Sequence, residues 1–346
     1  MKIRGLGRLK AQWSRIRGQL RPGPTVLLYH RVTQLAKDPH LLAVSPAHFE
    51  EQLLALRQHY EVVSLAELMR RVMRGMPVEP VVALTFDDGY ADNATAAPPL
   101  LKKHGVPAMF YLPSGFVGTT REYLQDDLER LLLLSEQCPE ELQLAVGGKR
   151  FAWEMGSQDG QEGIGARGSG WNVTLKRDPT PRHRAYREIH DLLRCSAPME
   201  RETVLQQLRN QCDDPGPARA THCAMSWDRA RDMAACELVE LGAHTVNHPW
   251  LSALSLADQR REILDSKRVL EEQIGRSVTS FAYPYGTRDS YTVETLALLR
   301  EARFTNACSN FRGRIGGNTD PFQIPRLVVR DWDGEEFLQQ LKAGQR

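Results

Sequence analysis

Two adjacent carboxylates, Asp87 and Asp88, directly follow the run VVALTF at residues 81–86. An unbroken run of such side chains is typical of a buried strand in a parallel sheet. Two like charges at the end of a strand repel each other and lose hydration free energy, so the pair adds little stability by itself. A bound cation would reverse that balance, which directs the search to further metal ligands. The alternative is a turn capped by the two side chains.

Two histidines, His244 and His248, offer such ligands in GAHTVNHPWLS at 242–252. At this spacing both imidazoles project to one side of a helical turn, as in sites where two histidines bind one metal. The pair alone is weak evidence, but it follows an apolar strand-like segment, just as the aspartates do. One carboxylate and two imidazoles would leave positions open for water and substrate. This is a hydrolytic arrangement for Zn²⁺ or a similar divalent ion.

The elements that must position these residues alternate along the chain from residue 24 onward. Strand-like segments are expected at 25–30, 81–86, 106–112, 237–245, 277–286, 304–309 and 323–332, with a short extended piece at 61–65. Helices are expected at 45–60, 64–75, 98–104, 226–236, 254–275 and 290–303. Strand–helix alternation with short connections predicts a parallel sheet, and about seven strands favour an incomplete barrel. In such folds the chemistry collects at the carboxyl ends of the strands.

A segment at about 118–225 breaks this alternation. It contains the glycine-rich stretch 156–170 and polar helical segments at 123–135, 185–195 and 199–211. The glycines and prolines between these helices indicate loops. We interpret the segment as an insertion that acts as a lid or a substrate-selecting cap.

The first 23 residues differ from the rest, residues 24–346, which we assign to one catalytic domain. Within 1–21, apolar side chains recur at helical spacing among seven Lys and Arg residues and no acids. A basic amphipathic helix suits an anionic membrane surface, so we predict peripheral membrane contact through 1–21. The alternatives are an arm docked on the domain or a solvated tail, and the glycines in this stretch weaken the helix.

Composition excludes several classes of protein. The 346 residues are 41% hydrophobic and 25% charged, as in soluble globular proteins, and the net charge of +2 does not favour nucleic acid as a partner. The six cysteines show no C-x-x-C spacing, which indicates reduced thiols. No apolar run reaches the length of a membrane span, and an apolar secretory signal is not evident. We therefore predict a cytoplasmic protein, peripheral on the inner membrane face if 1–21 binds lipid.

Three motifs resemble those of the polysaccharide deacetylase family, the NodB-homology domain of carbohydrate esterase family 4. They are TFDDGY (85–90), HTVNH (244–248) and FAYPYG (281–286), and the resemblance covers roughly 24–117 and 226–332. It implies a distorted (β/α)7 barrel, related to the TIM barrel, that carries a metal-dependent hydrolase. Such an enzyme removes an acyl group, usually acetyl, from the nitrogen of an amino sugar.

The resemblance also implies a role for each matching residue. Asp88, His244 and His248 match the metal ligands, and Asp87 matches the general base. The backbone N–H of Tyr285 matches the family's donor to the oxyanion. This division agrees with the chemistry, because ligation keeps one carboxylate anionic while the other can take a proton from the attacking water.

The chain departs from the common family pattern in two places. Ala282 occupies the position of an arginine that orients the base, and no histidine follows His248. His30, at the end of the first strand-like segment, instead resembles the histidine of the circularly permuted branch, the poly-N-acetylglucosamine deacetylases. We predict that His30 is the general acid; the alternative is a strand-end histidine bonded to a backbone carbonyl. Arg326 or Arg330 would replace the missing arginine, and we favour Arg326.

Tyr90, Pro284 and Trp332 are predicted to contact the substrate, although Trp332 could equally be a core residue. The predicted function is removal of an N-acyl group, most simply acetyl, from an amino sugar of a surface polysaccharide or of a lipid-linked or soluble precursor. The cofactor would be one divalent ion, with zinc as the default and iron, cobalt or nickel also compatible. Alternatives are a deformylase or amidase on another small amide, and a carbohydrate-binding protein with a vestigial site.

Overall fold

A computed structural model describes residues 23–76, 80–135, 138–156, 170–212 and 216–344, and all structural statements refer to these residues. The predicted amphipathic helix at 1–21 lies outside them. None of the described helices combines the length and the apolar character needed to cross a membrane.

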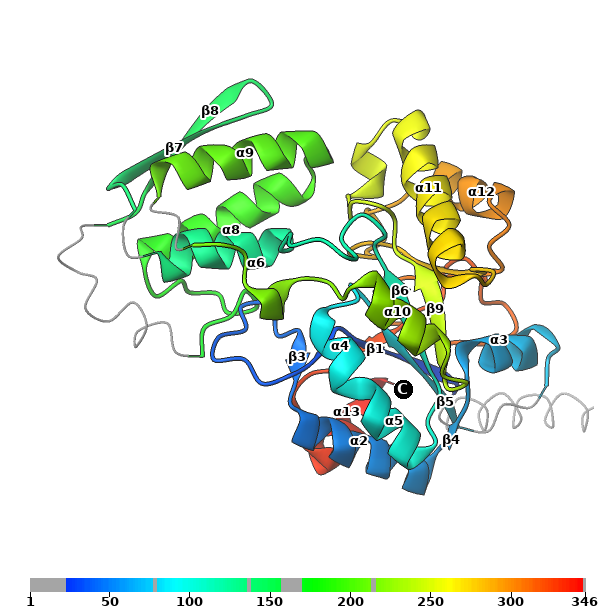
Figure 1. Cartoon of the computed structure of the whole chain (residues 1–346). Helices are drawn as coiled ribbons and strands as arrows, with labels where there is room; N and C mark the ends of the chain where they lie inside the picture. The colour runs from blue at the N-terminus through cyan, green and yellow to red at the C-terminus, as the bar shows by residue number, and fades with distance from the viewer. Residues whose placement is uncertain (1–22, 77–79, 136–137, 157–169, 213–215, 345–346) are drawn as a thin grey trace, which may run out of the picture.

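An eight-stranded sheet with parallel pairing forms the centre of the molecule (Figure 1). Its order is β11-β10-β9-β6-β5-β1-β12, and β4 pairs with the start of β5. The strands are β1 (Thr25–Tyr29), β4 (Glu61–Val62), β5 (Val81–Phe86), β6 (Ala108–Leu112), β9 (Val239–Ala243), β10 (Ser280–Ala282), β11 (Asn306–Cys308) and β12 (Leu327–Val328). Each lies within a segment predicted to be extended, and β5 is buried along its whole length, as its composition indicates.

The two ends of the strand order are linked through residues 321–329. Ile324 forms a parallel bridge with Cys308 on β11, and three residues later Leu327 pairs with β1. The segment therefore runs along one edge of the curled sheet and joins the other. Arg326 lies between the two contacts, and its side chain is fully buried. This arrangement confirms the predicted distorted barrel.

The helices that follow the strands lie outside the sheet (Figure 1). They are α2 (Pro46–His59), α3 (Leu65–Met73), α4 (Ala91–Thr95), α5 (Ala97–His104), α10 (Trp227–Ala234), α11 (Leu256–Ile274), α12 (Val293–Glu301) and α13 (Gly334–Gly344). Serine caps begin several of them: the Ser45 and Ser255 hydroxyls accept hydrogen bonds from backbone N–H groups in the first turns of α2 and α11. Gly275, with φ of 66°, ends α11 in the left-handed conformation that glycine adopts readily.

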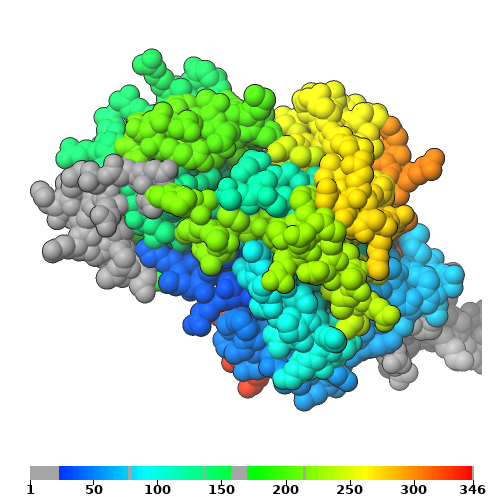
Figure 2. Space-filling model, in the orientation of Figure 1, coloured from blue at the N-terminus to red at the C-terminus, as the bar shows by residue number. Residues whose placement is uncertain are grey.

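The residues of the predicted insertion pack around a second hydrophobic core, separate from the core of the barrel. The elements are α6 (Leu124–Leu128), the π-helix η1 (Glu129–Leu134), the hairpin β7 (Glu141–Val146) and β8 (Lys149–Glu154), α8 (Pro181–Arg194) and α9 (Pro198–Gln211). The hairpin was not predicted, because Gly147 and Gly148 were taken only as loop formers. Both have positive φ, as a tight two-residue turn between antiparallel strands requires. Figure 2 shows the green surface of this unit beside the yellow surface around α11.

Two thiols meet in the core of the insertion although they are 74 residues apart in sequence. The sulfur atoms of Cys138 and Cys212 lie 3.2 Å apart, and both side chains are buried. We expect oxidised glutathione to convert them to a disulfide, which would raise the free energy of unfolding by about 4 kcal/mol. Thiol titration in denaturant should then find two fewer thiols, and the Cys138→Ser variant should show no such loss. An unchanged count in the wild type would contradict this.

Candidate active site

The predicted metal ligands meet at the carboxyl ends of β5 and β9. Asp88 Oδ1 lies 3.4 Å from His244 Nε2 and 3.3 Å from His248 Nε2, and the three side chains are buried. All three potential ligand atoms lie within 4.8 Å of one another, which allows them to bind one ion. A carboxylate with two imidazole nitrogens fits a divalent metal of the zinc or iron type. Burial alone would raise the pKa of Asp88, but the two neighbouring histidines bring it well below its ordinary value.

Hydrogen bonds behind the ligands hold them in position. His244 Nδ1 lies 2.8 Å from the Ala282 carbonyl, so this nitrogen carries the proton and Nε2 keeps its lone pair for a metal. The His248 N–H donates to Thr245 Oγ1 at 3.1 Å, and its carbonyl accepts from Arg201 at 3.3 Å. Asp88, His244 and His248 therefore have donor atoms that suit a metal ion, and hydrogen bonds hold the two histidines in position.

Four non-glycine residues at this site have left-handed backbone conformations: Asp88, Thr245, His248 and Tyr285, with φ between 51° and 68°. A side chain makes this conformation costly, by roughly 1–3 kcal/mol per residue. Strain concentrated on the ligands and the turn beside them indicates that the surrounding fold holds these side chains in a set geometry.

Arg326 pairs with the second carboxylate, Asp87, through two parallel hydrogen bonds of 2.7 and 2.6 Å. Its remaining donors reach Thr85 Oγ1 at 3.1 Å and the Ser309 carbonyl at 2.7 Å. Burial would raise the pKa of Asp87, but the Arg326 charge lowers it, so the carboxylate stays ionised. Arg326 therefore takes the place of the arginine that is missing at Ala282, and it pairs with Asp87. Arg330 instead donates to the backbone carbonyl of His40.

His30 and Tyr285 complete the predicted set. His30 follows β1 and lines the same cavity as Asp87 and Asp88. Burial lowers the pKa of His30, and the two aspartates only partly oppose this, so the neutral imidazole is favoured and its protonated form is a stronger acid than an ordinary imidazolium. Tyr285 is the centre of a tight turn in which the Gly286 N–H donates to the Pro284 carbonyl at 2.6 Å. Within the described residues the Tyr285 N–H has no acceptor, which leaves it available to an oxyanion.

These residues open into a cavity of about 350 Å³ between the barrel rim and the insertion. The barrel contributes His30, Leu42, Asp87, Asp88, His244, His248, Trp250, Tyr285, Thr287, Asn310, Val328 and Arg330, together with His40 from the β1–α2 segment. The insertion contributes Gln125, Val173, Thr174, Arg187, His190, Asp191 and Arg194. The volume is at the lower end for small-molecule sites, which are roughly 300–1,000 Å³.

The aromatic wall of the cavity was not predicted. The ring centroids of Trp250 and Tyr285 lie 5.1 Å apart. The Arg194 guanidinium lies 4.9 Å from the Trp250 centroid. The sequence offered one indication of this wall, because Trp250 lies two residues after His248. Such a face can stack on a sugar ring.

Three residues predicted to contact substrate do not line the cavity. Tyr90 is fully buried, its hydroxyl donates to Asp126 Oδ2 at 2.7 Å and its ring lies under Arg31, so the expectation of substrate contact is corrected. Pro284 is buried in its turn, and Trp332 packs against the barrel core. Pro284 and Trp332 therefore pack within the protein and do not line the cavity.

A second group of potential ligands, Asp126, Glu129 and His222, lies under the insertion. Its charges are compensated by the protein: Asp126 accepts from Tyr90, and Glu129 pairs with Arg219 at 2.8 Å. Burial raises the pKa of Asp126 to about 8, so this carboxyl is largely protonated at neutral pH. These contacts account for the group without a metal.

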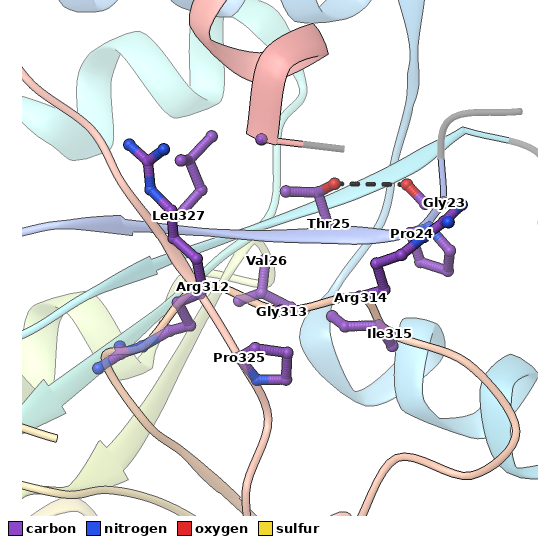
Figure 3. A pocket seen from close by; sticks show the side chains of 12 residues that line it. Gly23, Pro24, Thr25, Val26, Arg312, Gly313, Arg314, Ile315, Pro325 and Leu327 are labelled. Carbon is purple, nitrogen blue, oxygen red and sulfur yellow. Dashed lines mark hydrogen bonds between the residues drawn. The ribbon is translucent and has the colours of Figure 1, made fainter. Parts of the chain in front are cut away.

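A small pocket lies at the opposite end of β1, beside Thr25 and Val26 (Figure 3). Pro325 and the loop around Gly313 form its other side. It measures about 20 Å³, little more than one water molecule requires. The cavity at the carboxyl ends of the strands is the candidate active site because it contains the Asp88–His244–His248 group.

Comparison with known proteins agrees with this site. The family profile described as "Polysaccharide deacetylase" matches residues 74–138 and 211–307, which contain both aspartates, both histidines and Tyr285. The poly-beta-1,6-N-acetyl-D-glucosamine N-deacetylase of Escherichia coli (strain K12) is 32% identical over 99 residues, which is 28% of this chain and 15% of that protein. His30 and Arg326 lie outside the profile match.

Two solved structures share the fold. The Streptococcus pyogenes deacetylase PplD, determined in complex with acetate, has a TM-score of 0.56 and 18% identity, and the alignment covers 92% of this chain and 98% of that one. IcaB from Ammonifex degensii has a TM-score of 0.55 and 20% identity, with 94% and 98% covered. At these identities the similarity concerns the fold.

Fold and site together define an α/β barrel of the deacetylase type with three potential metal ligands at its rim. The family profile identifies a polysaccharide deacetylase domain in residues 74–138 and 211–307 of the chain.

Proposed function

We propose that this protein is a metal-dependent N-deacylase that removes an acetyl group from an amino sugar of a surface polysaccharide or its precursor. One observation carries the proposal: the Arg326-bound carboxylate of Asp87 and the Asp88–His244–His248 group line one cavity. The name of the E. coli relative supports an N-acetylated amino sugar as substrate. Zinc is the ion that we expect, from the donor set.

A divalent ion held by Asp88, His244 and His248 would polarise the amide carbonyl and lower the pKa of the attacking water. Asp87, kept ionised by Arg326, would accept the proton of that water as its oxygen attacks the carbonyl carbon. The Tyr285 N–H would donate to the carbonyl oxygen as negative charge develops there. His30, once it is protonated, would give that proton to the departing amine nitrogen, so that the C–N bond breaks with the amine leaving neutral and the acyl group leaving as acetate.

Metal content and acyl release test the proposal. We expect about one metal ion per chain in wild type and loss of both metal and activity in His244→Ala, by on the order of 10³-fold in kcat/KM. Elemental analysis gives the metal, and acetate and formate release from N-acylated amino-sugar oligomers gives the activity and the leaving acid. His59→Ala, at an exposed histidine of α2, is the matched control and should change neither. Full activity in His244→Ala would refute the proposed site.

A further inference from the structure

Arg330 presents a charge to the active-site cavity that no carboxylate among the described residues neutralises. Its guanidinium donates to the backbone carbonyls of His40, at 3.0 Å, and Leu41, and it forms no ion pair with any described carboxylate. Burial lowers the pKa of Arg330, and Asp38 opposes this only through its more distant charge. A partly desolvated cation without a carboxylate is costly to the fold, and an anionic ligand would remove that cost.

A second arginine enters the cavity from the insertion. Arg194, at the end of α8, lies over Trp250, and its side chain is 38% exposed. Asp191, one turn earlier, approaches its Nε at 3.3 Å, but that nitrogen makes no hydrogen bond. Arg194 therefore retains donors for a ligand beside the aromatic wall.

Arg330 and Arg194 help to lower the pKa values of two imidazoles in the cavity. The rings of His40 and His190 have centroids 4.6 Å apart. Burial and then Arg330 lower the pKa of His40 to about 4, and burial, His40 and Arg194 bring that of His190 well below its ordinary value. Both rings are therefore neutral and can offer N–H donors, and His40 Nε2 is a buried atom without a hydrogen-bond partner. Unused donors on this side of the cavity point to a ligand rich in oxygen.

The acids on the other side of the cavity are already engaged. Asp87 is paired with Arg326, and Asp88 belongs to the metal group. Arg187, although it lines the cavity, is bound to Asp178 and to the carbonyls of Val173 and Leu175. Asp191 also lines the cavity and pairs with Arg194, so the positive charge left for a ligand is centred on Arg330, and Arg194 adds further N–H donors.

We propose that the amino sugar deacylated here carries a phosphate ester, and that Arg330 and Arg194 bind its oxygens. This rests on the proposed deacylase function and narrows its substrate to phosphate-linked sugars. A phosphate ester offers several anionic oxygens and can contact two guanidinium groups from different elements at once, whereas one arginine fork is enough for a carboxylate. The phosphate could link the sugar to a lipid or to a nucleoside.

Three substrates with the same N-acetylglucosamine unit separate these cases: a neutral butyl glycoside, a short prenyl-diphosphate-linked sugar and a nucleoside-diphosphate-linked sugar. Acetate release gives kcat and KM for each, and calorimetry gives binding independently of turnover. We expect wild type to favour at least one phosphate-linked substrate over the glycoside by tenfold or more in kcat/KM, mainly through KM. The better of the two identifies the source of the phosphate.

Variants then assign the preference to the arginines. Arg330→Gln and Arg194→Glu should raise KM for the phosphate-linked substrate about tenfold and lower its kcat/KM relative to that of the glycoside by a similar factor, and Arg194→Lys should retain much of the preference. Arg184→Glu, at an exposed position of the same helix α8, is the matched control and should behave as wild type. Metal content must stay equal, since phosphate can also bind a metal.

The outcomes distinguish this inference from the proposed function. Equal kcat/KM and equal binding for glycoside and phosphate-linked sugars would overturn the phosphate inference and leave the deacylase standing. Binding of phosphate-linked sugars that depends on both arginines, without acyl release from any substrate, would support the phosphate site and overturn the deacylase. Equal losses on all three substrates in both variants would show that the arginines only support the fold.

Discussion

Asp87→Asn should lower kcat by on the order of 10²–10⁴-fold while the protein keeps its metal. Asparagine has nearly the same shape as aspartate but cannot take a proton from the attacking water. The ligands Asp88, His244 and His248 are untouched, so elemental analysis should find wild-type metal content. Metal loss in this variant would mean that Asp87 supports the ion instead of acting as the base.

The same variant should also be less stable, because it leaves the Arg326 charge buried without its carboxylate. Pairing Asp87→Asn with Arg326→Met separates the two effects. The double variant should recover part of the lost stability and none of the lost activity. Recovery of activity in the double variant would exclude Asp87 as the proton acceptor.

Arg326→Met alone should cost about 3–5 kcal/mol in the free energy of unfolding, measured by urea denaturation. The substitution strands a buried Asp87 anion and removes the hydrogen bonds to Thr85 and to the Ser309 carbonyl. Activity should fall as well, since the carboxylate loses its orientation. Arg268→Met, in an exposed pair with Glu272 on α11, is the control and should change stability by less than about 1 kcal/mol.

The cost of Arg326→Met should depend on pH in one direction. The folded-state pKa of Asp87 is lowered, chiefly by Arg326 acting against burial. The stabilisation from this pair is therefore fully present above the unfolded-state pKa of about 4 and is lost as pH falls through the folded-state value. Wild type and variant should converge in stability in acid. A constant difference down to low pH would assign the arginine's effect to packing alone.

The sequence sufficed for the barrel and for the proximity of Asp88, His244 and His248, because both depend on local patterns. The burial of β5 follows from its unbroken apolar run, and Asp88 follows that strand directly. His244 and His248 similarly follow β9. Short-range spacing was enough to bring such residues to one rim, since parallel strands end at the same edge of a sheet.

Other parts of the site depend on contacts between distant segments and could not be predicted. Deciding which of Arg326 and Arg330 pairs with Asp87 required two facts about distant segments. These are the register of β12 on β1 and the bridge between Ile324 and β11 just before it. Arg194 and His190 enter the cavity from the insertion, whose packing has no signature in spacing. The sequence does not indicate the direction of the Tyr90 side chain, because the backbone turns at positive φ at Asp88 and Gly89 just before it.

The left-handed conformations of Asp88, Thr245, His248 and Tyr285 set a limit on protein engineering. Substitutions to glycine there would relax the backbone, and a search for thermostable variants would reward them. At Asp88 and His248 the same change would delete a predicted metal ligand. Selection for heat resistance alone would therefore favour substitutions that remove active-site residues. Stabilising substitutions should be sought in the outer helices or in the core of the insertion.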